Sequence, residues 1–279
     1  MYELVISGGD SFTFGAELPT DNSVNPNPSS WANLVAQRIG KQHVNVARSG
    51  RSNSYISRHV HHQLQLAFEN NIGPEEIFVQ VMWTFVNRNE FAIGIPTVEY
   101  DSPWLFLTTF SHLDETESDW FKKTDQSLPN WKYVFEQLKS NYNRNRDLGI
   151  VDFAKNYNKL VQSQPLNDSY TSIKEVIHLQ NTLLLHKVSF LFTYVNQHVT
   201  QGLFHDADKN PGSQYLNSLR KFVKHKNWYS FPGNFQKYIG FDDWAKHNNY
   251  KYATSHPLEL AHADAADLIY HHLVKNNDK

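Results

Sequence analysis

The chain has 279 residues, of which 40% are hydrophobic, and this is enough to bury one large core, so a single domain is favoured over two. It contains no cysteine, which excludes a disulfide framework, a cysteine nucleophile and a metal held by thiolates. The formal net charge of -2 gives no electrostatic argument for a nucleic-acid partner. No apolar run approaches the ~20 residues that a membrane-spanning helix needs.

The N-terminus lacks the basic segment followed by an apolar one that a secretory signal has. The chain instead begins almost directly with an apolar, β-branched run at residues 4–6, which predicts a strand. We therefore expect a cytoplasmic or particle-associated protein.

Two glycines and a serine, Ser11, follow this first strand. A serine on a sharp turn at the carboxyl end of a strand can expose its hydroxyl group, and the neighbouring backbone N–H groups are then free to hold an oxyanion. An ordinary strand-turn-helix corner with a capping serine explains the same residues. The stretch alone does not choose between a nucleophile and a structural turn.

Helix and strand patterns then alternate along the chain. Apolar spacing and turn residues predict a helix at residues 31–39, a strand at 43–47, a helix at 55–70 and a strand at 77–83. This β-α-β-α-β order predicts an α/β protein, a three-layer α/β/α sandwich with a mainly parallel, flavodoxin-like sheet. Ligands of such sheets bind beyond the carboxyl ends of the strands.

The alternation is lost over residues 93–181, a segment that is rich in aromatic residues and partly helical in its pattern. We expect this segment to be an insertion or lid within a single domain that covers residues 1–279. A further strand is expected at residues 188–195 and a last helix at 259–274.

Three segments that border the expected sheet resemble the motif blocks of the SGNH (GDSL-type) hydrolases. Residues 9–11, Gly-Asp-Ser, resemble the first block, whose serine, here Ser11, is the nucleophile. Residues 45–53 resemble the second block, whose glycine, here Gly50, contributes an N–H group to the oxyanion hole. The pair His-Pro at residues 256–257 resembles the last block, which carries the catalytic base.

The resemblance implies a serine esterase that needs no cofactor and cleaves an acyl or acetyl ester through an acyl-enzyme on Ser11, with His256 as the base. A serine hydroxyl is a poor nucleophile at neutral pH unless a base is adjacent, and a neutral imidazole can accept its proton near pH 7. The expected partner is a small-molecule or glycan ester, and the sequence carries no signal for an oligomeric state.

The third block departs from the family pattern of Gly-x-Asn-Asp, in which the asparagine side chain is a further oxyanion donor. Residues 83–90 read Trp-Thr-Phe-Val-Asn-Arg-Asn-Glu here. We favour Asn87 as the third donor beside the N–H groups of Ser11 and Gly50, with Thr84 as the alternative. Supporting roles at the site are expected for three residues, Asp10, Asn53 and Thr84.

A second departure concerns the acid that orients the histidine. The family usually has an aspartate two or three residues before it, where this chain has Thr254 and Ala253. We expect its place to be taken by a backbone carbonyl, or by a carboxylate from elsewhere such as Asp242 or Asp243. An enzyme without any orienting group would be slow, because the loss of this group can cost ~10⁴-fold in turnover. The same departure is compatible with an alternative function, a catalytically weak or inactive SGNH-fold module for binding or structure within a larger assembly.

A metal-dependent hydrolase ranks last among the functions that we consider. The chain has fifteen histidines, but they are scattered and lack the spacing of metal ligands, so no metal is expected.

Overall fold

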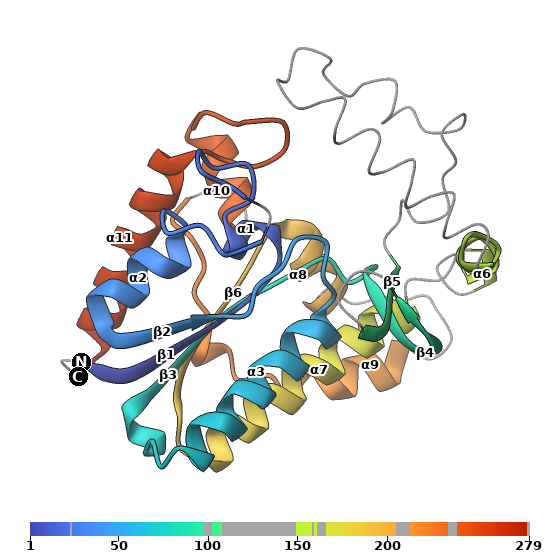
Figure 1. Ribbon diagram of the computed structural model, residues 1–279, viewed down its shortest axis with the longest axis horizontal. Coiled ribbons are helices and arrows are strands. Elements are labelled where there is room, and N and C mark those ends of the chain that lie inside the picture. The colour runs from blue at the N-terminus through green and yellow to red at the C-terminus, as the bar shows by residue number, and fades with distance from the viewer. Residues whose placement is uncertain are drawn as a thin grey trace.

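The computed structural model describes residues 1–22, 24–97, 102–107, 149–157, 159–160, 166–204, 213–233 and 239–277. At its centre lies a parallel sheet with the strand order β2-β1-β3-β6 (Figure 1). The strands span Tyr2–Gly8 in β1, Gly40–Asn45 in β2, Ile77–Trp83 in β3 and Ser189–Tyr194 in β6. This order, in which the chain starts in an inner strand and reverses direction across the sheet, is that of flavodoxin-like folds.

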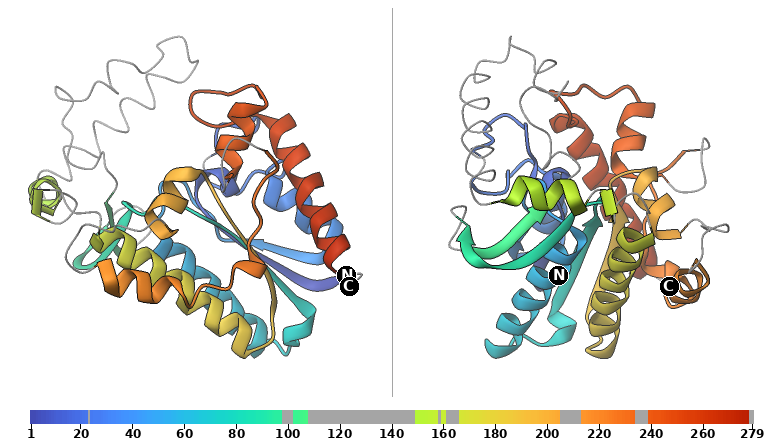
Figure 2. Two further views of the ribbon diagram at one scale, coloured as in Figure 1. Left: turned by 180° about the vertical axis from the view of Figure 1, so that it is seen from behind. Right: turned by 90° about the vertical axis from the view of Figure 1, so that its right-hand side faces the viewer.

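Helices cover both faces of the sheet, as the two views of Figure 2 make clear. On one face, α2 (Trp31–Ile39) packs against α11 (Glu259–Asn277), and on the other, α3 (Asn53–Glu69) packs against α7 (Leu166–Leu185). The predicted α/β/α sandwich with a mainly parallel sheet is therefore confirmed.

The residue types of the central strands explain why the sheet is buried on both sides. Every residue of β3, Ile-Phe-Val-Gln-Val-Met-Trp, is buried, as expected for a strand covered by helices on both faces. Its one polar side chain, Gln80, donates hydrogen bonds to Ser7 Oγ at 2.7 Å and to the carbonyl of Ala32 at 2.8 Å. The amide nitrogen of Gln80 is therefore hydrogen-bonded inside the core.

The region between β3 and β6 contains further elements. The strands β4 (Asn89–Thr97) and β5 (Ser102–Leu107) form an antiparallel pair, and α6 (Ile150–Tyr157) follows. Residues 98–101 and 108–148, most of the predicted insertion, lie outside the described residues.

The predicted end of the insertion at residue 181 differs from the structure. Helix α7 begins at Leu166 and contributes Ile173, Val176 and Leu179 to the main core, so the sandwich resumes about one helix earlier than the sequence suggested. Helical periodicity shows that a helix is amphipathic but does not show which neighbour it packs against.

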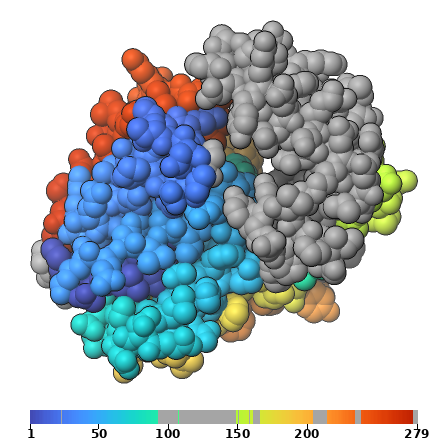
Figure 3. Space-filling model, viewed as in Figure 1, coloured from blue at the N-terminus to red at the C-terminus, as the bar shows by residue number. Residues whose placement is uncertain are grey.

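The remaining elements complete the carboxyl edge and flanks of the sheet. They are α1 (Ser11–Phe14), η1 (Pro74–Glu76), α8 (Gln197–Phe204), α9 (Ser213–Arg220), η3 (His225–Asn227) and α10 (Phe241–His247). In Figure 3 the N-terminal residues, in blue, lie against the C-terminal residues, in orange and red, so the two ends of the sequence share one side of the molecule. No helix among the described residues is long and apolar enough to cross a membrane.

Candidate active site

Ser11 lies on a tight turn at the carboxyl end of β1. The turn requires glycine before it, because a Cβ on Gly9 would lie 2.0 Å from Thr13 Oγ1. Asp10 is the N-cap of α1, and its carboxylate accepts a hydrogen bond from the N–H of Phe12 at 3.1 Å. Ser11 is thereby held as the first residue of α1, directly beyond the sheet.

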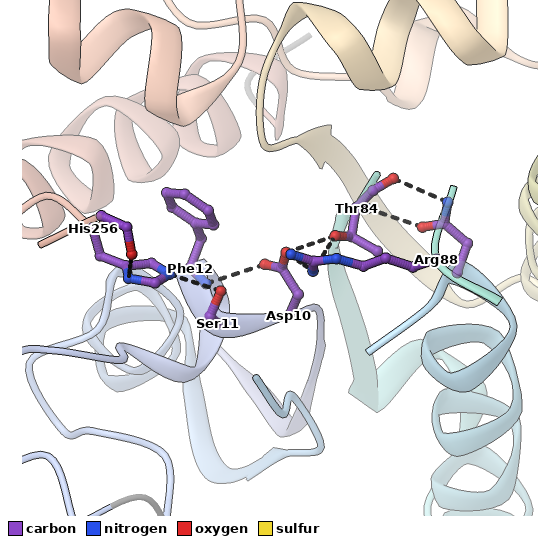
Figure 4. A network of polar contacts seen from close by, with 8 residues as sticks. Asp10, Ser11, Phe12, Thr84, Arg88 and His256 are labelled. Atoms are coloured by element: carbon purple, nitrogen blue, oxygen red, sulfur yellow. Dashed lines mark hydrogen bonds and ion pairs between the residues drawn. The ribbon is translucent and has the colours of Figure 1, made fainter. Parts of the chain in front are cut away.

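The imidazole of His256 lies against the hydroxyl group of Ser11. The distance from His256 Nε2 to Ser11 Oγ is 2.8 Å, within the hydrogen-bond range expected of a base and a nucleophile (Figure 4). The ring of Phe12 packs against the imidazole, with the ring centres 4.6 Å apart. The first and last motif blocks, 245 residues apart in the sequence, therefore meet at one point.

The other ring nitrogen of His256 faces a carboxylate that the sequence analysis missed. Glu17 Oε2 lies 3.2 Å from His256 Nδ1, and Ser255 Oγ lies 3.0 Å from the same nitrogen. The same carboxylate oxygen accepts hydrogen bonds from the backbone N–H of Ser255 at 2.9 Å and of His256 at 3.1 Å. No motif marks Glu17, since it stands in a loop six residues after the serine and not before the histidine.

Glu17 is ionised in this environment. Its partial burial raises the pKa of the carboxyl group, but the hydrogen bonds and charge of the His256 ring and the backbone N–H groups of Ser255 and His256 outweigh burial and lower the pKa from 4.5 to about 2. The folded protein therefore carries a negative charge beside His256 Nδ1 at any pH well above 2.

We expect Glu17 to make the free energy of unfolding depend on pH in the acidic range. Because the pKa is lower in the folded protein than in the unfolded chain, its contribution is complete above pH 4.5 and is lost as pH falls towards 2. The free energy of unfolding from urea titrations at pH 7 and pH 3 should therefore fall more for the wild type than for Glu17→Gln. Glu69→Gln, at an exposed helix position, should behave as the wild type. Equal losses for all three proteins would contradict this expectation.

The prediction that Asp242 or Asp243 orients His256 is wrong. Asp242 is bonded to Lys246 Nζ at 2.7 Å and to the hydroxyl of Tyr252 at 2.9 Å. Asp243 accepts hydrogen bonds from the backbone N–H of Gln197 at 2.7 Å and of Gly240 at 3.3 Å. Both lie in the first turn of α10, where acidic groups are favoured by the helix dipole.

The three residues expected to support the site form one buried network, of which Figure 4 labels Asp10 and Thr84. Asp10 accepts hydrogen bonds from Thr84 Oγ1 at 2.6 Å and from Arg88 Nη1 at 2.7 Å. Asn53 and the backbone of Thr84 bond reciprocally, at 2.9 and 3.0 Å. The network joins the ends of β1 and β3 to the start of α3. Because the hydroxyl hydrogen of Thr84 is donated to Asp10, Thr84 is a poor candidate for an oxyanion donor.

Two of the predicted oxyanion donors are backbone groups, the N–H groups of Ser11 and Gly50. No hydrogen bond between described residues uses the N–H of Ser11 or of Gly50. Gly50 has a φ of 73°, a left-handed conformation that favours glycine. The N–H of Arg48 donates to the carbonyl of Gly9 at 3.4 Å, which ties the Gly50 loop to the Ser11 turn. Asn87 lies in the half-buried turn after β3, and its role as third donor stays a prediction.

The described residues contain no group of three or more potential ligands for a metal ion. The groups that meet at Ser11 are its hydroxyl, the imidazole of His256 and the carboxylate of Glu17, a set that suits nucleophilic acyl transfer.

No protein-family model matches the chain, and no curated protein matches it. Among solved structures, the chain is similar to a phospholipase A1 from Streptomyces albidoflavus, with 10% sequence identity, a TM-score of 0.36 and coverage of 98% of this chain and 99% of that chain. At that TM-score the likeness carries no argument about activity. The assignment of the fold rests on the parallel sheet and the helices on its two faces.

Proposed function

We propose that this protein is a serine ester hydrolase of the SGNH (GDSL) type, which cleaves an acyl or acetyl ester of a small molecule or a glycan. The observation that carries the proposal is the 2.8 Å contact between Ser11 Oγ and His256 Nε2 at the carboxyl edge of the parallel sheet. A hydroxyl and an imidazole in this arrangement are the minimal nucleophile and base of acyl transfer.

The reaction has two halves. Ser11 Oγ attacks the carbonyl carbon of the ester while His256 Nε2 accepts the hydroxyl proton, and the proton then passes to the leaving alcohol. The N–H groups of Ser11 and Gly50 donate to the oxyanion of the tetrahedral intermediate. Water, deprotonated by the same nitrogen, then attacks the acyl-enzyme and releases the acid and free Ser11.

The alternative, an inactive module for binding or structure, drew its support from the missing aspartate before His256. Glu17 now offers a carboxylate at 3.2 Å from the ring, so this support is lost. The hydrolase is therefore the function that the described residues favour.

Labelling with a fluorophosphonate tests the proposal, since this reagent reacts with activated serines. Intact-mass measurement should detect a single adduct on the wild type and on Ser218→Ala, a change at an exposed serine of α9. Ser11→Ala should form no adduct. A wild type that stays unlabelled, or an adduct that persists in Ser11→Ala, would overturn the proposal.

A further inference from the structure

We propose that Glu17 is the positioning residue for His256, acting directly and through Ser255, so that the orienting carboxylate comes from the loop after the nucleophile. The inference rests on the proposed function, in which His256 must present an unprotonated Nε2 to Ser11. Neither the resemblance nor the spacing of the motif blocks assigns a role to this glutamate.

The contacts around His256 Nδ1 determine which ring nitrogen carries the proton. A carboxylate accepts hydrogen bonds and donates none, whereas the hydroxyl of Ser255 has one hydrogen to give. Ser255 Oγ lies 3.0 Å from Nδ1 and 3.3 Å from Glu17 Oε1. When Nδ1–H donates to Ser255 Oγ and the hydroxyl donates to Glu17, every group is satisfied and Nε2 is left free to accept from Ser11.

The opposite tautomer is disfavoured by the charge on Glu17. In that tautomer Nδ1 would present a lone pair to a carboxylate oxygen 3.2 Å away, and Nε2–H would point at Ser11 and could not take its proton. The neighbouring His262 adds no charge beside His256 at neutral pH, because burial lowers the pKa of its ring to about 3. Among the described residues, the ion pair of the His256 ring is with Glu17.

The backbone holds Glu17 in a conformation that ordinary loop residues avoid. Its φ is 65°, in the left-handed region, and its N–H donates to Asp21 Oδ2 at 2.8 Å. Its carboxylate is bonded to the N–H groups of Ser255 and His256. Strained residues persist where the surrounding contacts over-determine them, often at functional sites. These contacts also hold the loop that carries His256 in place. The test must therefore separate the effect of the charge of Glu17 from the effect of its hydrogen bonds to this loop.

Glu17→Gln makes this separation, because the amide oxygen can still accept from the two backbone N–H groups while the charge is lost. The ring ¹⁵N shifts of His256, assigned by their absence in His256→Ala, report the tautomer without any substrate. We expect Nδ1–H in the wild type and in Glu259→Gln, an exposed position just after the loop, and a shift towards Nε2–H in Glu17→Gln.

Kinetics with p-nitrophenyl acetate provide the second measurement. Glu17→Gln should lower kcat on the order of 10²- to 10⁴-fold, since loss of the orienting charge in a serine triad costs up to about 10⁴-fold, with little change in KM. Ser255→Ala leaves the direct contact of Glu17 with Nδ1, so it should keep the Nδ1–H tautomer. Its kcat should fall by about tenfold or less, as expected for the loss of one neutral hydrogen bond.

The outcomes separate the two proposals. A Glu17→Gln protein with the wild-type tautomer and kcat would overturn the role of Glu17, as would loss of the tautomer in Ser255→Ala alone. If Glu17→Gln proves unstable, the tautomer of His256 in Ser255→Ala still tests the direct contact with Glu17. The wild type could hydrolyse no ester while Glu17→Gln still changes the tautomer of His256. This pair of results would leave the positioning role of Glu17 in place and reject the proposed function.

Discussion

Replacing His256 with alanine should lower kcat for p-nitrophenyl acetate on the order of 10⁴- to 10⁶-fold, and replacing Ser11 with alanine should do the same. The two side chains act on one proton, since His256 Nε2 lies 2.8 Å from Ser11 Oγ and no other imidazole contacts this hydroxyl among the described residues. Once either side chain is absent, the proton transfer between them cannot take place.

The double variant distinguishes this mechanism from two independent contributions. Ser11→Ala with His256→Ala should be no slower than either single variant, because residues that act as a unit give strongly non-additive losses. His62→Ala, at an exposed position of α3, should keep the wild-type kcat and serves as the control. Undiminished hydrolysis in His256→Ala would place the base elsewhere, and additive losses would contradict a shared proton.

The fold could be read from the sequence because its signals are local. The run of β3, apolar except for Gln80 and buried throughout, and the alternation of strands with capped helices are typical of a parallel sheet covered on both sides. Ser30 and Ser52, which cap α2 and α3, are ordinary helix-start residues. The contact between Ser11 and His256 followed from the resemblance of the motif blocks and the common edge that parallel strands provide.

Glu17 could not be predicted in the same way. Its partners are 238 and 239 residues distant in the sequence, and its position depends on a left-handed backbone conformation that no residue pattern marks at a glutamate. Asp242 and Asp243 had an equally plausible sequence position, but local sequence does not distinguish a carboxylate at a helix start from one that faces the active site. The roles of such residues depend on loop geometry.

The last prediction concerns the buried carboxylate beside the nucleophile. Arg88→Met should lower the free energy of unfolding by about 3 kcal/mol or more, because it leaves Asp10 without its cation. Asp10 is 0% exposed, and Arg88 Nη1 lies 2.7 Å from its carboxylate. Urea titration measures the loss. The exposed pair of Arg38 and Asp267 offers the matched control, for which Arg38→Met should cost at most about 1 kcal/mol.

Addition of Asp10→Asn to Arg88→Met should recover part of the lost stability, since the buried charge is then removed along with its partner. The recovery will be incomplete, because asparagine is only a neutral acceptor for the Thr84 hydroxyl and the Phe12 N–H, both of which bond to the carboxylate in the wild type. If Arg88→Met costs no more than Arg38→Met, the hydrogen bonds from Thr84 and Phe12 suffice to hold the carboxylate. Arg88 would then be dispensable for the turn that carries Ser11.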